Sequence, residues 1–472
     1  MSSFEARLDT RTVARSIAPQ AWMRFLGSQR WFSGKGRSIS SVQVTSTCVV
    51  DSALVVAVLK VIYEVGEDED YLLPLLLCQD CPGEAIGQIE GRPVVDALSI
   101  EEGWRRLLEA FGRSHHPGDL ELKIHLESNF SFRKGEFTMG STDQTNSWAI
   151  VGGMFVKVYR RLQHGENLDV EVCRFLTQAE FPLTPVLRGV INACGSFGEA
   201  TLLSVQDMVP NQGTGWDLAR RQVDAVVRGH EVDYGPWGCL GVSLARLHRV
   251  LAAGETPGTQ PLSTPDLKAL AQLALALARN VLAELEGAKL DPAASGLAQL
   301  LRFRTSNLLR RIKAPQIPSG LCHRQRIHGD IHLGQVLWNG ERFFIIDFEG
   351  EPARPVEERR RKTSVAKDVA GVLRSFDYAA RAGLPEGAGA KGEAIANQWR
   401  NLARQAFRTA YEGEIGGEPF LPADAALSDQ LISLFELEKA FYELRYELSH
   451  RPDWVGIPMA GLLDLTNAKK PV

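Results

Sequence analysis

Two aspartates occur in different settings within the stretch "HGDIHLGQVLWNGERFFIIDFEG", residues 328–350. Asp330 lies in a polar turn, whereas Asp347 follows directly after the apolar run "RFFII". Phosphoryl transfer needs one carboxylate near the attacking hydroxyl to accept its proton, and separate oxygen ligands that hold Mg²⁺ on the ATP phosphates. A loop leaves a base free to meet substrate, and a buried strand can fix a metal-binding carboxylate. The stretch therefore indicates phosphoryl transfer.

The spacing of these residues follows the order of the same groups in protein kinases. There the catalytic loop reads H-R-D-x-x-x-x-N, and a D-F-G aspartate follows on a strand and turn. Asp330 and Gln335 have the spacing of that Asp and Asn, and Asp347 opens the later "DFEG". Each piece alone is weak, since a lone aspartate in a turn usually only shapes the turn. The ordered combination is specific.

A kinase-like site also requires an upstream lysine on a strand and a helical glutamate to pair with it. "MFVKVYRR" places Lys157 in an apolar strand, and Glu171 follows in the helical run "DVEVCRFL". An apolar-flanked lysine is more often an edge charge that extends to solvent. The functional interpretation depends on the position of Lys157 before the catalytic loop.

Chain length and net charge limit the number of substructures and the kind of partner. At 472 residues, two or three substructures with ample core are expected. With 53 Lys plus Arg against 57 Asp plus Glu, the formal charge of −4 offers no general field for a polyanion. Nucleic acid is not expected as a partner.

Cysteine usage and the apolar runs predict a cytoplasmic protein. Seven cysteines are scattered and odd in number, which fits a reducing compartment. Cys78 and Cys81 in "CQDC" are interpreted as packed thiols, because no second pair completes a metal site. The N-terminus has no secretory h-region, and the most apolar run, "YLLPLLLC", is too short to span a bilayer. No membrane partner is expected.

Three segments with different periodicity must position these residues. Residues 37–78 alternate β-rich runs with turns, which predicts an antiparallel meander. A second β-rich block starts near residue 120, and helical spacing dominates from about Asp217. We therefore expect an α+β chain with a β-rich cap at 1–110, a mixed lobe at 111–208 and a helical lobe at 209–472.

These segments resemble the aminoglycoside-phosphotransferase type of eukaryotic-like kinase, and more closely the bacterial maltokinases. The resemblance covers nearly the whole chain and rests on "QRWFSGKGR", "DQTNSW", "VKVYRRL", "VPNQGTGW", "HGDIHLGQVL", "DFEGEPARPVEERR", "DVAGVLRSFDYAA" and "EKAFYELRYELSHRPDWVGIP". It implies a bilobal, protein-kinase-like fold. It also implies Mg²⁺-dependent transfer of phosphate from ATP to the anomeric hydroxyl of maltose, in glycogen and trehalose metabolism, and association with trehalose synthase.

The resemblance also implies the roles of individual residues. Asp330 would be the catalytic base, and the metal ligands would be Gln335, Asp347 and Glu349. The nucleotide would contact Lys157, Glu171, Thr145, Ser147, Gln206 and Met208, the last two in a hinge at residues 205–209.

This chain departs from the protein-kinase pattern at two places. Gln335 replaces an asparagine, which lengthens the metal-binding arm by one methylene. No G-x-G-x-x-G is present, so "GSTDQTNSW" would bind phosphates through backbone N–H groups and the hydroxyls of Thr145 and Ser147. The alternative is a polar β-turn with no ligand.

The acceptor site is predicted on "LISLFELEKAFYELRYELSH". Its core face would be a stripe of Leu434, Leu437, Phe441, Leu444 and Leu448. A neighbouring stripe holds Lys439, Tyr442, Glu443 and Tyr446, and aromatic rings beside charged groups suit a sugar. Tyrosines packed between helices would explain the pattern equally well, and the resemblance favours the sugar.

Two other functions stay open. One is another small-molecule kinase, for glucosamine or an aminoglycoside, although no strongly acidic pocket for a polycation is evident. The other is a catalytically silent nucleotide-binding partner of trehalose synthase, against which the presence of Lys157, Asp330, Gln335 and Asp347 argues. Asp368 is expected to anchor its helix to the catalytic loop. The run "EERRRK", residues 357–362, could clamp phosphate, but such runs are usually solvated faces.

Overall fold

The computed structural model describes residues 10–78, 84–109, 118–127, 135, 137–140, 146–254, 258–318, 320–352 and 354–467. The chain forms two compact units, one of Met1–Thr177 with Pro185–Met208 and one of Gln178–Thr184 with Val209–Val472. The first unit contains the predicted cap and, apart from residues 178–184, the predicted mixed lobe. A division of the chain at residue 110 stays a prediction.

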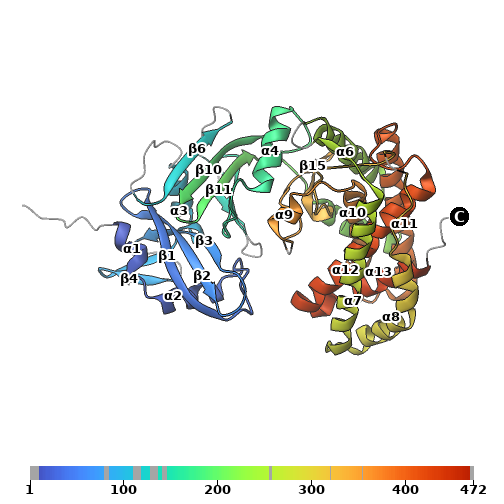
Figure 1. Cartoon of the computed structure of the whole chain (residues 1–472), viewed down its shortest axis with the longest axis horizontal. Helices are drawn as coiled ribbons and strands as arrows, with labels where there is room; N and C mark the ends of the chain where they lie inside the picture. Colours follow the sequence, from blue (N-terminus) through green and yellow to red (C-terminus); the bar gives the residue numbers. More distant parts are fainter. Residues whose placement is uncertain are drawn as a thin grey trace, which may run out of the picture. The chain divides into compact units, whose positions relative to one another are not determined.

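The first unit begins with helices on an antiparallel sheet (Figure 1). The sheet has the strand order β1-β2-β3-β5-β4, with bounds β1 Ile39–Val49, β2 Leu54–Tyr63, β3 Glu69–Leu77, β4 Gly87–Ile89 and β5 Arg92–Asp96. The helices are α1 Thr10–Ser16, α2 Pro19–Ser28 and α3 Glu101–Glu109. Consecutive strands pair through short turns, as the meander pattern predicted.

A second antiparallel sheet follows in the same unit, with the strand order β6-β10-β11-β9-β8-β7. Its strands are β6 Glu121–Leu126, β7 Phe137–Met139, β8 Ser147–Val151, β9 Met154–Val158, β10 Leu187–Gly195 and β11 Gly198–Asp207. Helix α4, Leu168–Gln178, lies between β9 and β10 in the sequence.

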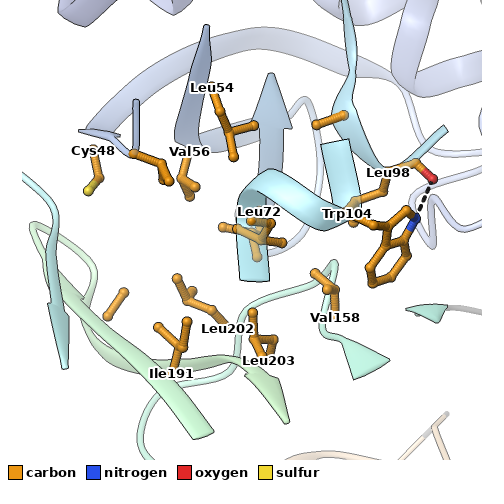
Figure 2. Packing of buried hydrophobic residues seen from close by; sticks show 14 of the residues in the cluster. Cys48, Leu54, Val56, Leu72, Leu98, Trp104, Val158, Ile191, Leu202 and Leu203 are labelled. Atoms are coloured by element: carbon orange, nitrogen blue, oxygen red, sulfur yellow. Dashed lines mark hydrogen bonds between the residues drawn. The ribbon is translucent and has the colours of Figure 1, made fainter. Parts of the chain in front are cut away.

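Strand β2 is apolar except at Lys60, and both of its faces are buried over most of its length. Leu54, Val56 and Val58 belong to a core that also contains Ile191 and Leu203 of the second sheet (Figure 2). The alternate residues of β2 belong to a different core with helices α1 and α2. Successive strand residues point to opposite faces, so one strand contributes to both cores.

The second unit is mainly helical. Its helices are α5 Gly215–Val227, α6 Gly235–Ala253, α7 Thr264–Gly287, α8 Pro292–Arg311, α9 Val356–Arg359, α10 Ala366–Ala382, α11 Gly389–Ile415, α12 Ala425–His450 and α13 Gly456–Asn467. Two antiparallel pairs join β12 Thr259–Pro261 to β13 His323–Gln325, and β14 Val336–Trp338 to β15 Phe343–Ile345. Short 3₁₀ turns are at Ala97–Ser99, Leu333–Gln335 and Pro452–Trp454.

Helix α12 packs against α7, α10 and α13. The predicted apolar stripe is confirmed, since Leu434, Leu437, Phe441 and Leu444 are buried in one core with residues of α7, α8 and α13. This core fixes the rotation of α12 about its axis. The rotation of α12 also fixes the direction in which the neighbouring stripe faces, and this stripe holds the predicted acceptor residues.

Two further expectations from the sequence can be compared with the structure. Cys78 is disulfide-bonded, so its interpretation as a packed thiol is wrong; Cys81 lies outside the described residues. No helix among the described residues has both the length and the apolar character needed to cross a membrane.

Candidate active site

The catalytic loop runs between β13 and β14 and is hydrogen-bonded to a side chain of α10. The backbone N–H groups of His328 and Gly329 both donate to the carboxylate of Asp368, at 2.8 and 2.9 Å. Gly329 has φ of +86°, a conformation that glycine adopts without strain. The prediction that Asp368 anchors its helix to this loop is confirmed.

Asp368 is fully buried and remains a carboxylate. Burial would raise its pKa, but the hydrogen bond and charge of His248, together with His328 and the Gly329 N–H, lower the pKa below its usual value. The ring of His248 lies 3.1 Å from Asp368 and 2.8 Å from the hydroxyl of Tyr411. This network fixes the backbone immediately before Asp330.

Asp330 shares a lysine with a second carboxylate. The Nζ of Lys439 on α12 donates to Asp330 Oδ1 at 2.8 Å and to Glu351 Oε1 at 2.9 Å. Burial would lower the pKa of Lys439, but the charges of Asp330 and Glu351 raise it well above its usual value. Lys439 is therefore a permanent cation that fixes one oxygen of Asp330.

Glu351 is the centre of a buried ion cluster. Its Oε2 accepts from Lys367 at 3.0 Å and also from Arg354, and Arg354 further pairs with Glu358 and Glu438. Burial would raise the pKa of Glu351, but the surrounding cations lower it well below its usual value. Through Glu351 Oε1, the cluster also holds the ammonium group of Lys439 that contacts Asp330.

The two principal metal-ligand candidates contact each other. Gln335 Nε2 donates to Asp347 Oδ2 at 2.7 Å, and the backbone N–H of Ile346 donates to the Gln335 carbonyl at 3.0 Å. Asp347 has φ of +68°, a left-handed conformation that is costly for a non-glycine residue and clusters at functional sites. The predicted metal-binding residue at the strand end thus has an uncommon backbone conformation.

The donor chemistry at this pair fits Mg²⁺. A carboxylate and an amide oxygen are hard ligands, and Mg²⁺ commonly takes one or two protein oxygens while water and phosphate supply the rest. Glu349 lies two residues further along the chain, and its backbone carbonyl accepts from Arg359 at 2.8 Å. The ligand roles of all three residues stay predictions.

A cavity of about 500 Å³ opens beside Asp330, within the second unit. Lys439, Tyr442, Glu443 and Tyr446 all line it, so the structure brings the four predicted acceptor residues together with the predicted base. Five aromatic side chains contribute to its wall, namely Trp216, Tyr378, Tyr442, Tyr446 and Trp454. The cavity has both the size and the lining of a small-molecule site.

Every carboxylate in the lining of this cavity has a cationic partner. Asp330 pairs with Lys439, Glu443 accepts from Arg374 at 2.7 Å, and Glu447 accepts from Arg451 at 2.7 Å. Burial raises the pKa of Glu443 even though the charges of Arg374 and Lys439 act in the opposite direction. The wall combines aromatic rings with hydrogen-bonding groups, and its negative charge is already compensated.

Within the first unit, Lys157 pairs with a carboxylate that the sequence analysis did not select. Its Nζ lies 3.3 Å from Asp169 Oδ2, which also accepts from the hydroxyl of Tyr159 at 3.2 Å. Asp169 is buried in the first turn of α4, two residues before Glu171. The strand lysine and helical carboxylate expected of a kinase are present, and the role of Glu171 stays a prediction.

The other predicted nucleotide residues already have structural contacts. Ser147 accepts from Arg160 at 2.8 Å, Gln206 donates to Cys173 Sγ at 3.4 Å, and the backbone N–H of Met208 donates to Gly153 at 3.3 Å. Thr145 lies outside the described residues. Nucleotide binding by these four residues stays a prediction.

Several residues of the site were missed by sequence reasoning. Glu351 stands in the quoted "DFEGEP", and Trp216 and Trp454 stand in the quoted "VPNQGTGW" and "HRPDWVGIP". A tryptophan or a glutamate within these motif segments could have been selected as a candidate site residue. Arg374 gives no such signal, because a basic residue within an amphipathic helix is expected at the surface.

Comparison with known proteins gives two family matches. Residues 25–99 match the maltokinase N-terminal cap domain, and residues 151–403 match the phosphotransferase enzyme family. A glucosamine kinase of Streptacidiphilus jiangxiensis is 29% identical over 335 residues, covering 68% of this chain and 72% of the relative. A glucosamine kinase of Mycolicibacterium smegmatis (strain ATCC 700084 / mc(2)155) is 26% identical over 334 residues, covering 68% and 77%.

Solved structures show the same fold. A glucosamine kinase in complex with glucosamine, ADP and inorganic phosphate has a TM-score of 0.65 at 19% identity, with 94% of this chain and 99% of that chain covered. A second crystal form of glucosamine kinase has the same TM-score and coverage at 21% identity. The predicted α+β, kinase-like fold is confirmed. Since the match at residues 151–403 spans more than half of its 472 residues, this chain belongs to the phosphotransferase enzyme family.

Proposed function

We propose that this enzyme transfers the γ-phosphoryl group of ATP to the anomeric hydroxyl of maltose, giving maltose 1-phosphate and ADP. The observation that carries the proposal is the cavity of about 500 Å³ beside Asp330, whose wall combines five aromatic rings with charge-compensated carboxylates. Rings stack on the C–H faces of sugars, and the polar groups between them can hydrogen-bond the hydroxyls.

In this proposal Asp330 is the catalytic base. Its Oδ1 accepts a hydrogen bond from Lys439, so the proton of the attacking hydroxyl would pass to Oδ2. At the same time the sugar oxygen would bond to the γ-phosphorus, and ADP would depart in line. Lys157 would contact the phosphates. Gln335 and Asp347 would hold Mg²⁺, which when bound offsets the negative charge of the phosphates.

The charge of the cavity supports maltose over glucosamine, although the two curated relatives above are glucosamine kinases. Glucosamine carries an ammonium group, which a site would hold with an available carboxylate. Asp330, Glu443 and Glu447 each already pair with a cation. An uncharged disaccharide would leave these pairs intact.

A panel of sugars tests the choice of acceptor. With ATP and Mg²⁺ present, ADP release is measured for maltose, glucose and glucosamine, and we expect kcat/KM to be highest for maltose. A higher value for glucosamine would overturn maltose and leave the kinase standing. If no sugar stimulates ADP release, the catalytically silent alternative would be favoured.

Tyr446→Ala is expected to lower kcat/KM for the sugar up to about tenfold, with the KM for ATP unchanged, since an aromatic contact is typically worth about 0.5 to 1.5 kcal/mol beyond the area it buries. Tyr446 is 42% exposed, so its removal should barely change Tm. Tyr442 is less suitable as a test because Lys439 Nζ, which lies 4.7 Å from its ring centre, also contacts the predicted base Asp330.

Phe303→Ala is the matched control for Tyr446→Ala, because Phe303 is 90% exposed on α8. Its sugar kinetics should equal those of the unmodified enzyme. A Tyr446→Ala enzyme with an unaltered sugar KM and kcat would remove Tyr446 from the acceptor site.

Association with trehalose synthase, and a role in glycogen and trehalose metabolism, are proposed from the maltokinase resemblance alone. Co-purification of the two proteins from a mixture would support the association, and separate elution at micromolar concentrations would contradict it.

A further inference from the structure

A second cavity, of about 210 Å³, lies in the helical unit between α7, the segment 350–367 and α12. We name it the α7 cavity. It shares no lining residue with the cavity beside Asp330. Neither the predicted chemistry nor the proposed acceptor site makes use of it.

The α7 cavity has one apolar wall. Ala269, Leu270 and Leu273 line it from one face of α7, at the spacing of successive helical turns. Leu273 is 59% exposed, so much of its side chain is open to solvent. This wall offers an apolar surface that a ligand could cover.

The other wall is basic. Arg354, Arg361, Lys362 and Lys367 line it from the segment that includes the run "EERRRK". The cavity therefore gathers charges that the sequence pattern alone assigned to a solvated face. Arg324 contributes a further cation from β13.

The carboxylates that line the α7 cavity are already engaged. Asp266 pairs with Arg324, and Glu351, Glu358 and Glu438 all pair with Arg354. Within the part of the chain that the structure describes, no carboxylate lies within ion-pair distance of Arg361 or Lys362. Two positive charges in the lining are left without compensation.

The lining also contains an unsatisfied buried donor. The Nε–H of Arg324 is buried and has no hydrogen-bond partner among the described residues. A buried polar group without a partner is costly and often marks a site for water or an ion. The donor and the two uncompensated cations thus point to an anionic ligand.

We propose that the α7 cavity binds a small organic phosphate. Arg361, Lys362 and the Arg324 Nε–H would hold the phosphate, whose two negative charges match the two uncompensated cations. The organic part would lie on Leu270 and Leu273. The site is separate from the reaction and does not depend on the identity of the sugar acceptor.

Isothermal titration calorimetry with phenyl phosphate tests this proposal, with ADP and Mg²⁺ present at saturating concentrations to occupy the nucleotide site. In R361Q/K362Q we expect about tenfold weaker binding, since two exposed charge contacts together are worth roughly 1.4 kcal/mol. The activity of this variant should be unchanged. R302Q/R310Q removes two exposed arginines from α8 and should bind like the unmodified protein.

A comparison of probes tests the apolar wall. Leu273→Ser should weaken phenyl phosphate binding severalfold and leave inorganic phosphate binding unchanged. Four results would overturn the proposal: no binding of phenyl phosphate, unaltered binding in R361Q/K362Q, an equal loss in R302Q/R310Q, or equal affinity for phenyl phosphate and inorganic phosphate.

Discussion

Asp330→Asn is expected to reduce turnover by about 10² to 10⁴-fold and to leave the affinity for ATP unchanged. The asparagine keeps an oxygen that can accept from Lys439, which lies 2.8 Å from Asp330 Oδ1. It cannot take the proton of the attacking hydroxyl. The loss should therefore appear in the chemical step, measured as the single-turnover rate of ADP formation.

Glu341→Gln is the control for this variant, because Glu341 is an exposed carboxylate in the turn between β14 and β15. Its turnover should be normal. Both variants should keep the Tm of the unmodified enzyme. Turnover of Asp330→Asn within threefold of normal would remove Asp330 from the role of base.

Glu351→Gln is expected to lower the free energy of unfolding by about 3 to 5 kcal/mol near neutral pH, the usual cost of breaking a buried ion pair. Lys439, Lys367 and Arg354 all donate to this one carboxylate, whose side chain is 1% exposed. An uncharged amide would take one anionic partner away from each of these three cations inside a buried cluster. Chemical denaturation of both proteins measures the difference.

The difference in the free energy of unfolding between the unmodified enzyme and Glu351→Gln, here called the stability gap, should decrease as the pH falls. Burial would raise the pKa of Glu351, but Lys439, Lys367 and Arg354 lower it well below the ordinary value of 4.5. Because the folded pKa is the lower one, the stability contributed by Glu351 is present above pH 4.5 and is lost as the pH falls through the folded pKa. The gap should be steady near neutral pH and shrink in acid.

Glu357→Gln is the matched control, since Glu357 is an exposed carboxylate in the same segment. Its unfolding curve should coincide with that of the unmodified enzyme at every pH. If the gap for Glu351→Gln were small at neutral pH, or were unchanged in acid, the ion cluster would not be a source of stability.

The catalytic loop could be predicted from the sequence because its chemistry is local. Asp330, Gln335 and Asp347 lie in one continuous stretch, so their spacing alone indicated a base and two metal ligands. The structure adds the hydrogen bond between Gln335 and Asp347 and the left-handed backbone of Asp347. Their catalytic and metal-binding roles stay predictions.

The face of α12 could also be predicted because helical periodicity is local. The buried stripe at Leu434, Leu437, Phe441 and Leu444 orients the neighbouring face, and the acceptor candidates Lys439 and Tyr442 follow from it.

Contacts between distant segments could not be predicted. Lys439 and Glu351 are 88 residues apart, and no periodic pattern relates them. The ion pair between Lys157 and Asp169 depends on how α4 is rotated against the sheet, which a short acidic run does not encode. Arg374 looks like a surface residue in the sequence, yet it is fully buried between Asp377 and Glu443.

Phosphorus NMR of the enzyme with ATP, Mg²⁺ and maltose tests the central claim most directly. We predict a new phosphate-ester signal, coupled to the anomeric proton of the sugar, that grows in equal amount with ADP. The signal should be absent without enzyme and nearly absent with Asp330→Asn. ADP that accumulates with inorganic phosphate alone, or a phosphate ester on another hydroxyl of maltose, would contradict the account.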